Sequence, residues 1–101
     1  MTLSLIIETE LATMTGHIEK LEQAEAFLNT VNMAMDDDST LAELTVYKFM
    51  VMVAFGLAND VDVNEFEEID TTDLEIEVDS LKAELTYAFK DIQVAIDARR
   101  A

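Results

Sequence analysis

The sequence predicts an all-α protein, a small helical bundle of two long amphipathic helices around one apolar helix, with a short acidic helical turn. Proline is absent and glycine occurs only twice among 101 residues, whereas a small β-rich domain needs many turn-forming residues. Apolar residues recur every three or four positions towards both ends of the chain, as on one face of a helix. The length fits a single domain, residues 1–101, near the common size of roughly 100 to 150 residues.

Residues 3 to about 35 have the spacing of one long amphipathic helix. Its polar side is expected to carry Glu8 and Glu10, among other charged residues. Gly16 lies inside the pattern and costs about 1 kcal/mol relative to alanine, so it marks a bend or a break; we expect one continuous helix. The apolar stripe comprises Leu3, Ile7, Leu11, Met14, Ile18, Leu21, Leu28 and Met35.

Residues 41–58 form the one segment that is apolar on every side. The three aspartates at 36–38 precede it, and Thr40 with Glu43 fits a capping box, in which both side chains bond amides of the first turn. The valine and aromatic content would also suit a strand, but the length and the cap favour a helix that ends near Ala58. Asn59 is then expected to be a left-handed cap. Such a helix needs cover on all sides, which predicts a homodimer with part of Leu44–Leu57, or the long helices, at its interface.

The rest of the chain is expected to hold a short helix and a long one. A short acidic helix is expected from Asp62 through Ile69, and Thr72 with Glu75 fits a second capping box. The long amphipathic helix then runs from Leu74 to about Arg99. Its apolar stripe comprises Leu74, Val78, Leu81, Leu85, Ala88, Ile92 and Ala95.

Composition restricts the setting in which the protein works. Cysteine is absent, so neither a disulfide nor a thiolate metal site can form. The N-terminus has no basic residue before its apolar run, and 41–58 falls short of the ~20 apolar residues of a membrane span. We therefore expect a cytoplasmic protein, in the host cytoplasm if it is phage-encoded. Its acidity argues against direct contact with nucleic acid or an anionic membrane.

Acid density is the most prominent chemical feature of the sequence. The formal net charge is -16, and no lysine or arginine lies between Lys48 and Lys82. Carboxylates at this density repel one another, so we expect them to serve a basic partner, such as a nucleic acid-binding protein whose cleft they enter in place of phosphates. The alternative is a solvated acidic face kept for solubility or salt adaptation. The candidate partner-binding residues are Asp60, Asp62, Glu65, Glu67, Glu68, Asp70, Asp73, Glu75, Glu77, Asp79, Glu84 and Asp91.

The sequence motifs give little support for a catalytic site or a metal site. An EF-hand reading of the segment from Asp60 fails, because Glu65 stands where the loop needs glycine and Thr71 where it needs a bidentate glutamate. His17 is the only histidine, and we expect it at the surface or half-buried. With no second histidine, no cysteine and no glycine-rich phosphate loop, we expect a protein that is not an enzyme and that uses no cofactor.

These observations lead to three functional hypotheses. The first is a small non-enzymatic inhibitor with an acidic surface, analogous in size and charge to phage antirestriction proteins, anti-CRISPR proteins and glycosylase inhibitors, although no motif of those families is matched. The second is a helical structural or assembly adaptor, or a chaperone, that binds through an apolar surface with methionines such as Met50 and Met52. The third is an antitoxin-like neutraliser of a basic protein.

Overall fold

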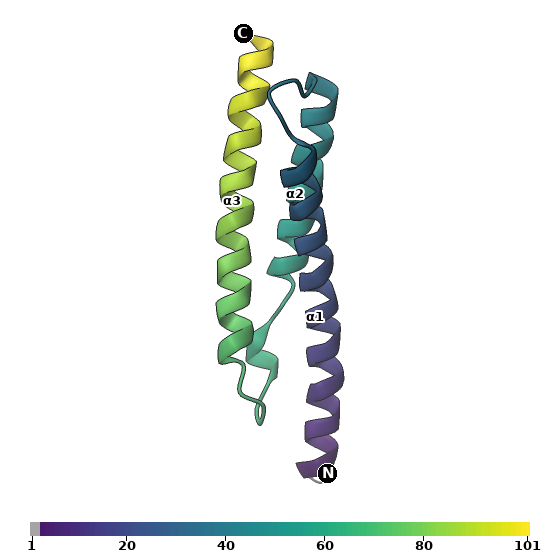
Figure 1. The fold of residues 1–101 in the computed structure, drawn as a ribbon. Coiled ribbons are helices and arrows are strands. Elements are labelled where there is room, and N and C mark those ends of the chain that lie inside the picture. The colour runs from purple at the N-terminus through teal and green to yellow at the C-terminus, as the bar shows by residue number, and fades with distance from the viewer. Residues whose placement is uncertain (1–2) are drawn as a thin grey trace.

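The computed structural model describes residues 3–101 and confirms the all-α class. Three long helices and one 3-10 turn follow one another, and the described residues contain no strand. The elements are α1 (Leu3–Ala34), α2 (Leu41–Asn59), η1 (Val63–Glu65) and α3 (Thr72–Arg100). They form a rod with extents of 62 × 16 × 16 Å, and the N-terminal end of α1 projects beyond the start of α3 (Figure 1).

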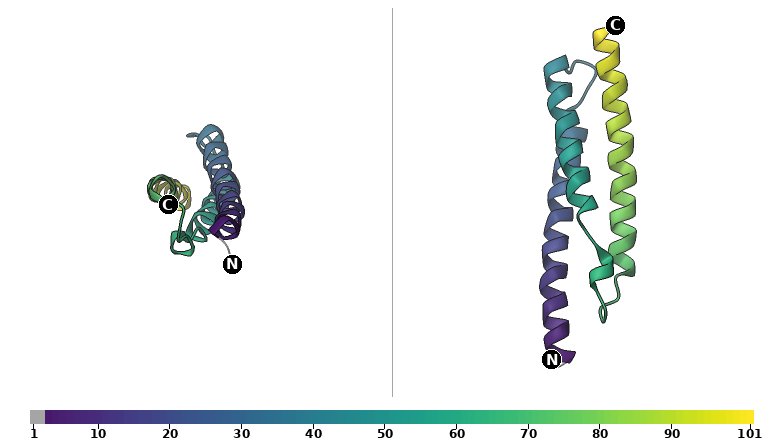
Figure 2. Two further views of the ribbon diagram at one scale, coloured as in Figure 1. Left: turned by 90° about the horizontal axis from the view of Figure 1, so that it is seen from below. Right: turned by 180° about the vertical axis from the view of Figure 1, so that it is seen from behind.

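The central helix of the rod is α2. It runs antiparallel to α1 and α3 and packs against both, whereas α1 and α3 run in the same direction and contact each other far less (Figures 1 and 2). Ala54 and Ala58 of α2 are fully buried, and their small side chains let the neighbouring helices approach closely. Because α1 and α3 are held mainly through α2, the line along which they meet is less closely packed and contains two hollows, which we describe together as the groove between α1 and α3.

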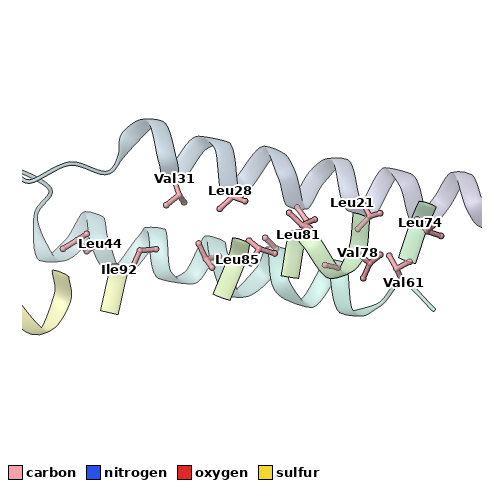
Figure 3. Close-up of a cluster of buried hydrophobic side chains, with 14 of the residues drawn as sticks. Leu21, Leu28, Val31, Leu44, Val61, Leu74, Val78, Leu81, Leu85 and Ile92 are labelled. Atoms are coloured by element: carbon pink, nitrogen blue, oxygen red, sulfur yellow. The ribbon is translucent and has the colours of Figure 1, made fainter. Parts of the chain in front are cut away.

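One apolar layer runs along the rod where the three helices meet. Leu44 of α2 and Leu85 and Ile92 of α3 have no exposed surface. Figure 3 shows Leu28 and Val31 of α1 pointing towards the apolar side chains of the other two helices. The stripe predicted for α3 is confirmed in this layer, since its leucine, valine and isoleucine members are all buried.

The predicted stripe of α1 is correct only in its C-terminal half. Leu11 and Ile18 are 53% and 42% exposed, whereas Glu10 and His17 are each only 6% exposed. The assignments of Glu10 to the polar face and of His17 to the surface or a half-buried position are therefore wrong. The reason is that α1 here packs against the segment 60–71 instead of a helix. The helix continues through Gly16 without a break, as expected.

The helix boundaries confirm one cap and correct three other expectations. The capping box at α2 is present: Thr40 Oγ1 accepts from Glu43 N at 3.1 Å, and Glu43 Oε1 accepts from Thr40 N at 3.0 Å. Asn59 is the last residue of α2 and is not a left-handed cap, because no described non-glycine residue has positive φ. The expected second box is absent, since Thr72 already lies in α3. The short helix expected through Ile69 is only the three-residue η1.

The capping box makes a pH-dependent contribution to stability. The Thr40 backbone N–H, followed by its hydroxyl, lowers the pKa of Glu43 below its ordinary value of 4.5. A lowered folded-state pKa stabilises the fold above the unfolded-state pKa, and this stabilisation is lost as pH falls through the folded-state value. We therefore expect Glu43→Gln to be less stable than wild type at neutral pH, with the gap closing between about pH 5 and pH 3.

Urea unfolding of both proteins across that pH range measures the gap. Glu19→Gln, at an exposed position of α1, is the matched control because it removes one carboxylate without touching a cap. A gap for Glu43→Gln that is unchanged at the lowest pH would contradict a role for the ionised carboxylate.

One stretch of the described chain, Leu41–Glu65, is long and apolar enough to cross a membrane by the criteria of length and composition. The sequence-based expectation considered only the shorter stretch 41–58 and placed it below the required length. A core helix of a soluble protein can meet the same criteria, so the result is weak evidence for a membrane location. The cytoplasmic location therefore stays a prediction.

Candidate functional site

The groove between α1 and α3 is the strongest candidate site, and the part of it near the start of α3 is acidic. Glu25 of α1 lies across this groove from Glu77 and Glu84 of α3, with Ser80 between the two glutamates. All three carboxylates are on exposed residues. Two parallel helices that pack on the same third helix thus bring together acidic residues more than 50 positions apart in the sequence.

The part of the groove near the end of α3 contains further acidic groups. Asp36 and Asp37, just after α1, face Asp91 of α3, and Asn32 lies one turn earlier on α1. Arg99 also lines this part and is the only basic residue among the lining residues of both parts. We refer to Glu25, Asp36, Asp37, Glu77, Glu84 and Asp91 together as the acidic groove.

Arg99 is occupied with the backbone of the loop 36–40. Its Nε donates to the carbonyl of Ser39 at 3.0 Å, and its Nη2 donates to the carbonyl of Asp37 at 2.8 Å. The buried Ser39 hydroxyl in turn accepts from the Asp36 N–H at 3.0 Å. Arg99 therefore connects the end of α3 to the α1–α2 loop and holds Asp36 and Asp37 beside the groove.

The carboxylates of α3 that line the groove are regularly spaced. Glu77, Glu84 and Asp91 follow one another at seven-residue intervals, which corresponds to about 10.5 Å per step along a helix. Residues seven apart lie nearly on one line of the helix surface, so the row keeps one orientation. A rigid row of carboxylates can pair with lysine and arginine side chains of a partner through charge-assisted hydrogen bonds.

Several predicted site residues instead have local structural roles. Asp62 Oδ1 accepts from Asn64 N at 2.9 Å and caps η1. Glu65 Oε1 lies 3.1 Å from Nε2 of His17. Asp70 Oδ1 accepts from the hydroxyl of Thr72 at 2.7 Å and from its N–H at 3.0 Å, and these bonds lower the pKa of Asp70, the hydroxyl contributing most.

The segment 60–71 is attached to α1 through two buried polar residues. The carboxylate of Glu10 accepts from the backbone N–H groups of Glu67 and Glu68, the latter at 3.1 Å to Oε1 and 3.2 Å to Oε2. The ring of His17 makes an edge contact with Phe66 at 5.9 Å between centroids. Sequence periodicity missed both anchors, because their partners lie about 50 residues away.

The structure therefore divides the twelve predicted site residues. It places Glu77, Glu84 and Asp91 in the acidic groove. Glu75 and Asp79 line a different hollow, next to η1 and with Lys82 beside them. The exposed Asp73 lies in the first turn of α3 and Asp60 caps the end of α2, while the remaining five lie in the connection 62–70.

Sequence reasoning also left three members of the acidic groove out of the predicted site. Glu25 belongs to a row with Glu19 and Glu22 on α1, but nothing in the sequence indicates that this helix lies beside α3. Asp36 and Asp37 were interpreted only as residues before a helix start. Within residues 3–101, no group of three or more histidine, aspartate or glutamate side chains is placed to hold a metal ion.

No family model, curated protein or solved structure matches this chain. The geometry and charge of the chain itself therefore carry the functional argument.

Proposed function

We propose that this protein is a small non-enzymatic inhibitor whose acidic groove binds a basic, nucleic acid-binding protein and occupies its nucleic acid site. The observation that carries this proposal is the groove itself: two parallel helices and one anchored loop present carboxylates along most of the length of α3. Lysine and arginine side chains that hold phosphates would find acceptors at regular intervals along such a surface.

The groove glutamates are free to pair with a partner. Among residues 3–101 the only ion pair within 4.0 Å joins His17 and Glu65, so Glu25, Glu77 and Glu84 have no lysine or arginine partner. A large excess of like charge reduces the stability of a compact fold, and a cationic partner relieves this repulsion. The net charge of -16 also speeds the approach of a basic protein at low ionic strength.

Charge reversal in the groove is the direct test. The triple variant Glu77→Lys/Glu84→Lys/Asp91→Lys is expected to weaken partner binding at least about 100-fold, because close charge pairs across an interface contribute roughly 2–5 kcal/mol each. The partner is first captured from an extract of the native host at low salt and identified by mass spectrometry. Affinity is then measured by calorimetry, together with competition by DNA or RNA and the dependence on salt.

The control must separate the groove from net charge. Glu8→Lys/Glu75→Lys/Asp79→Lys makes the same change in charge at exposed positions outside the groove. We expect this variant to retain most of the affinity. Equal losses in both triple variants would show that overall charge carries binding, and a partner that binds nucleic acid and this protein at the same time would contradict occupation of the nucleic acid site. A captured partner that is a basic toxin would instead identify an antitoxin.

A second candidate function, that of an assembly adaptor, is favoured by the exposed apolar side chains of α2. Val46, Phe49 and Met52 are each more than half exposed. An adaptor that binds through these residues would lose its partner on substitution of Phe49, would tolerate the groove variant, and would be little affected by salt. The salt dependence of the captured complex distinguishes the two candidates.

A further inference from the structure

The outward face of α2, opposite its packed face, carries several exposed apolar side chains. Val46 is 56% exposed, Phe49 66%, Met52 53% and Val53 38%. The residues that pack inward, such as Leu44 and Val51, lie on the other side of the helix. The acidic groove does not use this surface, so an inference from it is independent of the proposed inhibitor. The adaptor would use the same side chains, so self-association through this surface counts against that second candidate function.

The residues of this face are spaced as in a helix-pairing seam. Ala42, Val46, Phe49, Val53 and Gly56 follow one another at intervals of four, three, four and three, the a/d repeat by which two helices pack. All five are exposed, and the seam is about 21 Å long at 1.5 Å per residue. Side-chain size along the seam is symmetric about Phe49, with a valine on each side and a small residue at each end.

We propose that a second copy of this chain covers the seam, with the two α2 helices antiparallel and the two-fold axis at Phe49. A two-fold interface places the same patch of both subunits face to face, so a seam that is symmetric about its centre matches its own reverse. In this register Phe49 meets Phe49 and each Ala42 meets a Gly56. Each Val46 lies one residue, about 1.5 Å along the axis, from the Val53 of the other copy. A Cβ built at Gly56 has no heavy atom within 4 Å, so this end of the seam is open.

The exposed apolar area is of the size that a dimer needs. From their exposed fractions, Val46, Phe49, Met52 and Val53 together present on the order of 400 Å² of apolar surface. A standard interface buries about 800 Å² per partner, of which roughly 65% is apolar in homodimers. The seam thus supplies most of the apolar area of one standard interface.

The charge distribution favours a second copy over a basic partner on this face. Between Glu43 and Asp60, α2 carries no carboxylate, so a cationic helix would find no counter-charge along the seam. The one charge within this interval, Lys48, has its ammonium 5.4 Å from the ring centroid of Phe89 and is thus turned towards α3. Back-to-back pairing through α2 also keeps the two acidic grooves on opposite outer sides of the dimer.

Charge substitution at the axis tests the pairing. Phe49→Glu and Phe49→Lys are each expected to weaken self-association at least about tenfold in sedimentation equilibrium, because each places two like charges together. An equimolar mixture of the two variants is expected to restore dimers. Val94→Glu, at a position of α3 that is 70% exposed, is the control and should dimerise like wild type. Far-UV circular dichroism of the variants checks that the helices persist.

Cysteine pairs test the register, since the chain has no cysteine of its own. A mixture of Val46→Cys and Val53→Cys chains is expected to form a disulfide-linked heterodimer on mild oxidation, whereas Val46→Cys alone should not cross-link, because a disulfide needs Cα atoms within about 7 Å. Cross-linking of Val46→Cys with itself would indicate a parallel pair and overturn the register.

Two results would overturn the proposal as a whole. One is a wild-type chain that stays monomeric up to about 1 mM. The other is binding of the wild-type chain, as a monomer, to phosphatidylcholine vesicles. If Phe49→Glu abolishes that binding, a membrane and not a second copy occupies the seam. Since the two copies repel each other, wild-type self-association is expected to strengthen with salt, opposite to partner binding in the acidic groove.

Discussion

A Leu85→Ala variant is expected to lose about 2–5 kcal/mol of unfolding free energy, the range found for large-to-small changes in closed cores. Leu85 has no exposed surface and lies in the layer that joins α3 to α2. The rod is only 16 Å wide, and within residues 3–101 this layer is the one buried apolar cluster, so no second core compensates for the cavity. Since small domains have a total stability of about 5–15 kcal/mol, the variant is expected to be partly unfolded at 37 °C.

Urea unfolding followed by circular dichroism measures this loss. Val94→Ala, on the same helix but 70% exposed, is the matched control and should change stability by no more than about 0.5 kcal/mol. Both variants must be compared at one protein concentration, because self-association would add to the apparent stability. A loss below about 1 kcal/mol for Leu85→Ala would contradict the packing described for the core.

The parts of the fold that depend on local sequence were predictable. The period of apolar residues in α3 identifies its buried side from Leu74 to Ile92, because these residues all belong to the one buried apolar cluster. The capping box of Thr40 and Glu43 could also be predicted from the sequence, since both of its hydrogen bonds lie within four residues. The capping box predicted at Thr72 and Glu75 does not form. Asp70, two residues before Thr72, instead accepts hydrogen bonds from the hydroxyl and the N–H of that threonine.

The parts that depend on distant contacts were not predictable. The N-terminal half of α1 buries Glu10 and His17 and exposes Leu11, the reverse of what periodicity indicates, because its neighbour is an irregular segment with free N–H groups. The acidic groove likewise requires that α1 and α3 lie in parallel on α2. A row of acids on one helix predicts a charged stripe, but only the packing shows that Glu25 faces Glu77.

The two surfaces of the rod follow from the same arrangement. Because α2 packs against both neighbours on one side, its other side stays open, and the apolar seam and the acidic groove point in opposite directions. The sequence indicated that an apolar helix of this length needs further cover, and the exposed Phe49 is the remaining uncovered part. The chain thus separates an uncharged surface, where we propose that a second copy binds, from a charged surface, where we propose that a basic partner binds.

Replacement of Glu10 by alanine is expected to detach the segment 60–71 from α1. The buried carboxylate accepts from the N–H groups of Glu67 and Glu68, and an unsatisfied buried donor costs about 1–3 kcal/mol. Without the carboxylate, the two amides either become exposed to water or stay buried without an acceptor. Exposure costs less free energy, because water then accepts their hydrogen bonds. We therefore expect much faster hydrogen exchange at both amides and a stability loss of about 1–3 kcal/mol.

Two further variants separate the anchor from general effects of charge. Glu8→Ala removes an exposed carboxylate from the same helix and should leave exchange at both amides unchanged. Glu10→Gln keeps an acceptor oxygen but loses the charge, and it should fall between wild type and Glu10→Ala because bonds to charged groups are stronger. Unchanged protection of the Glu67 and Glu68 amides in Glu10→Ala would show that His17 and the apolar contact of Phe66 hold the segment without the carboxylate.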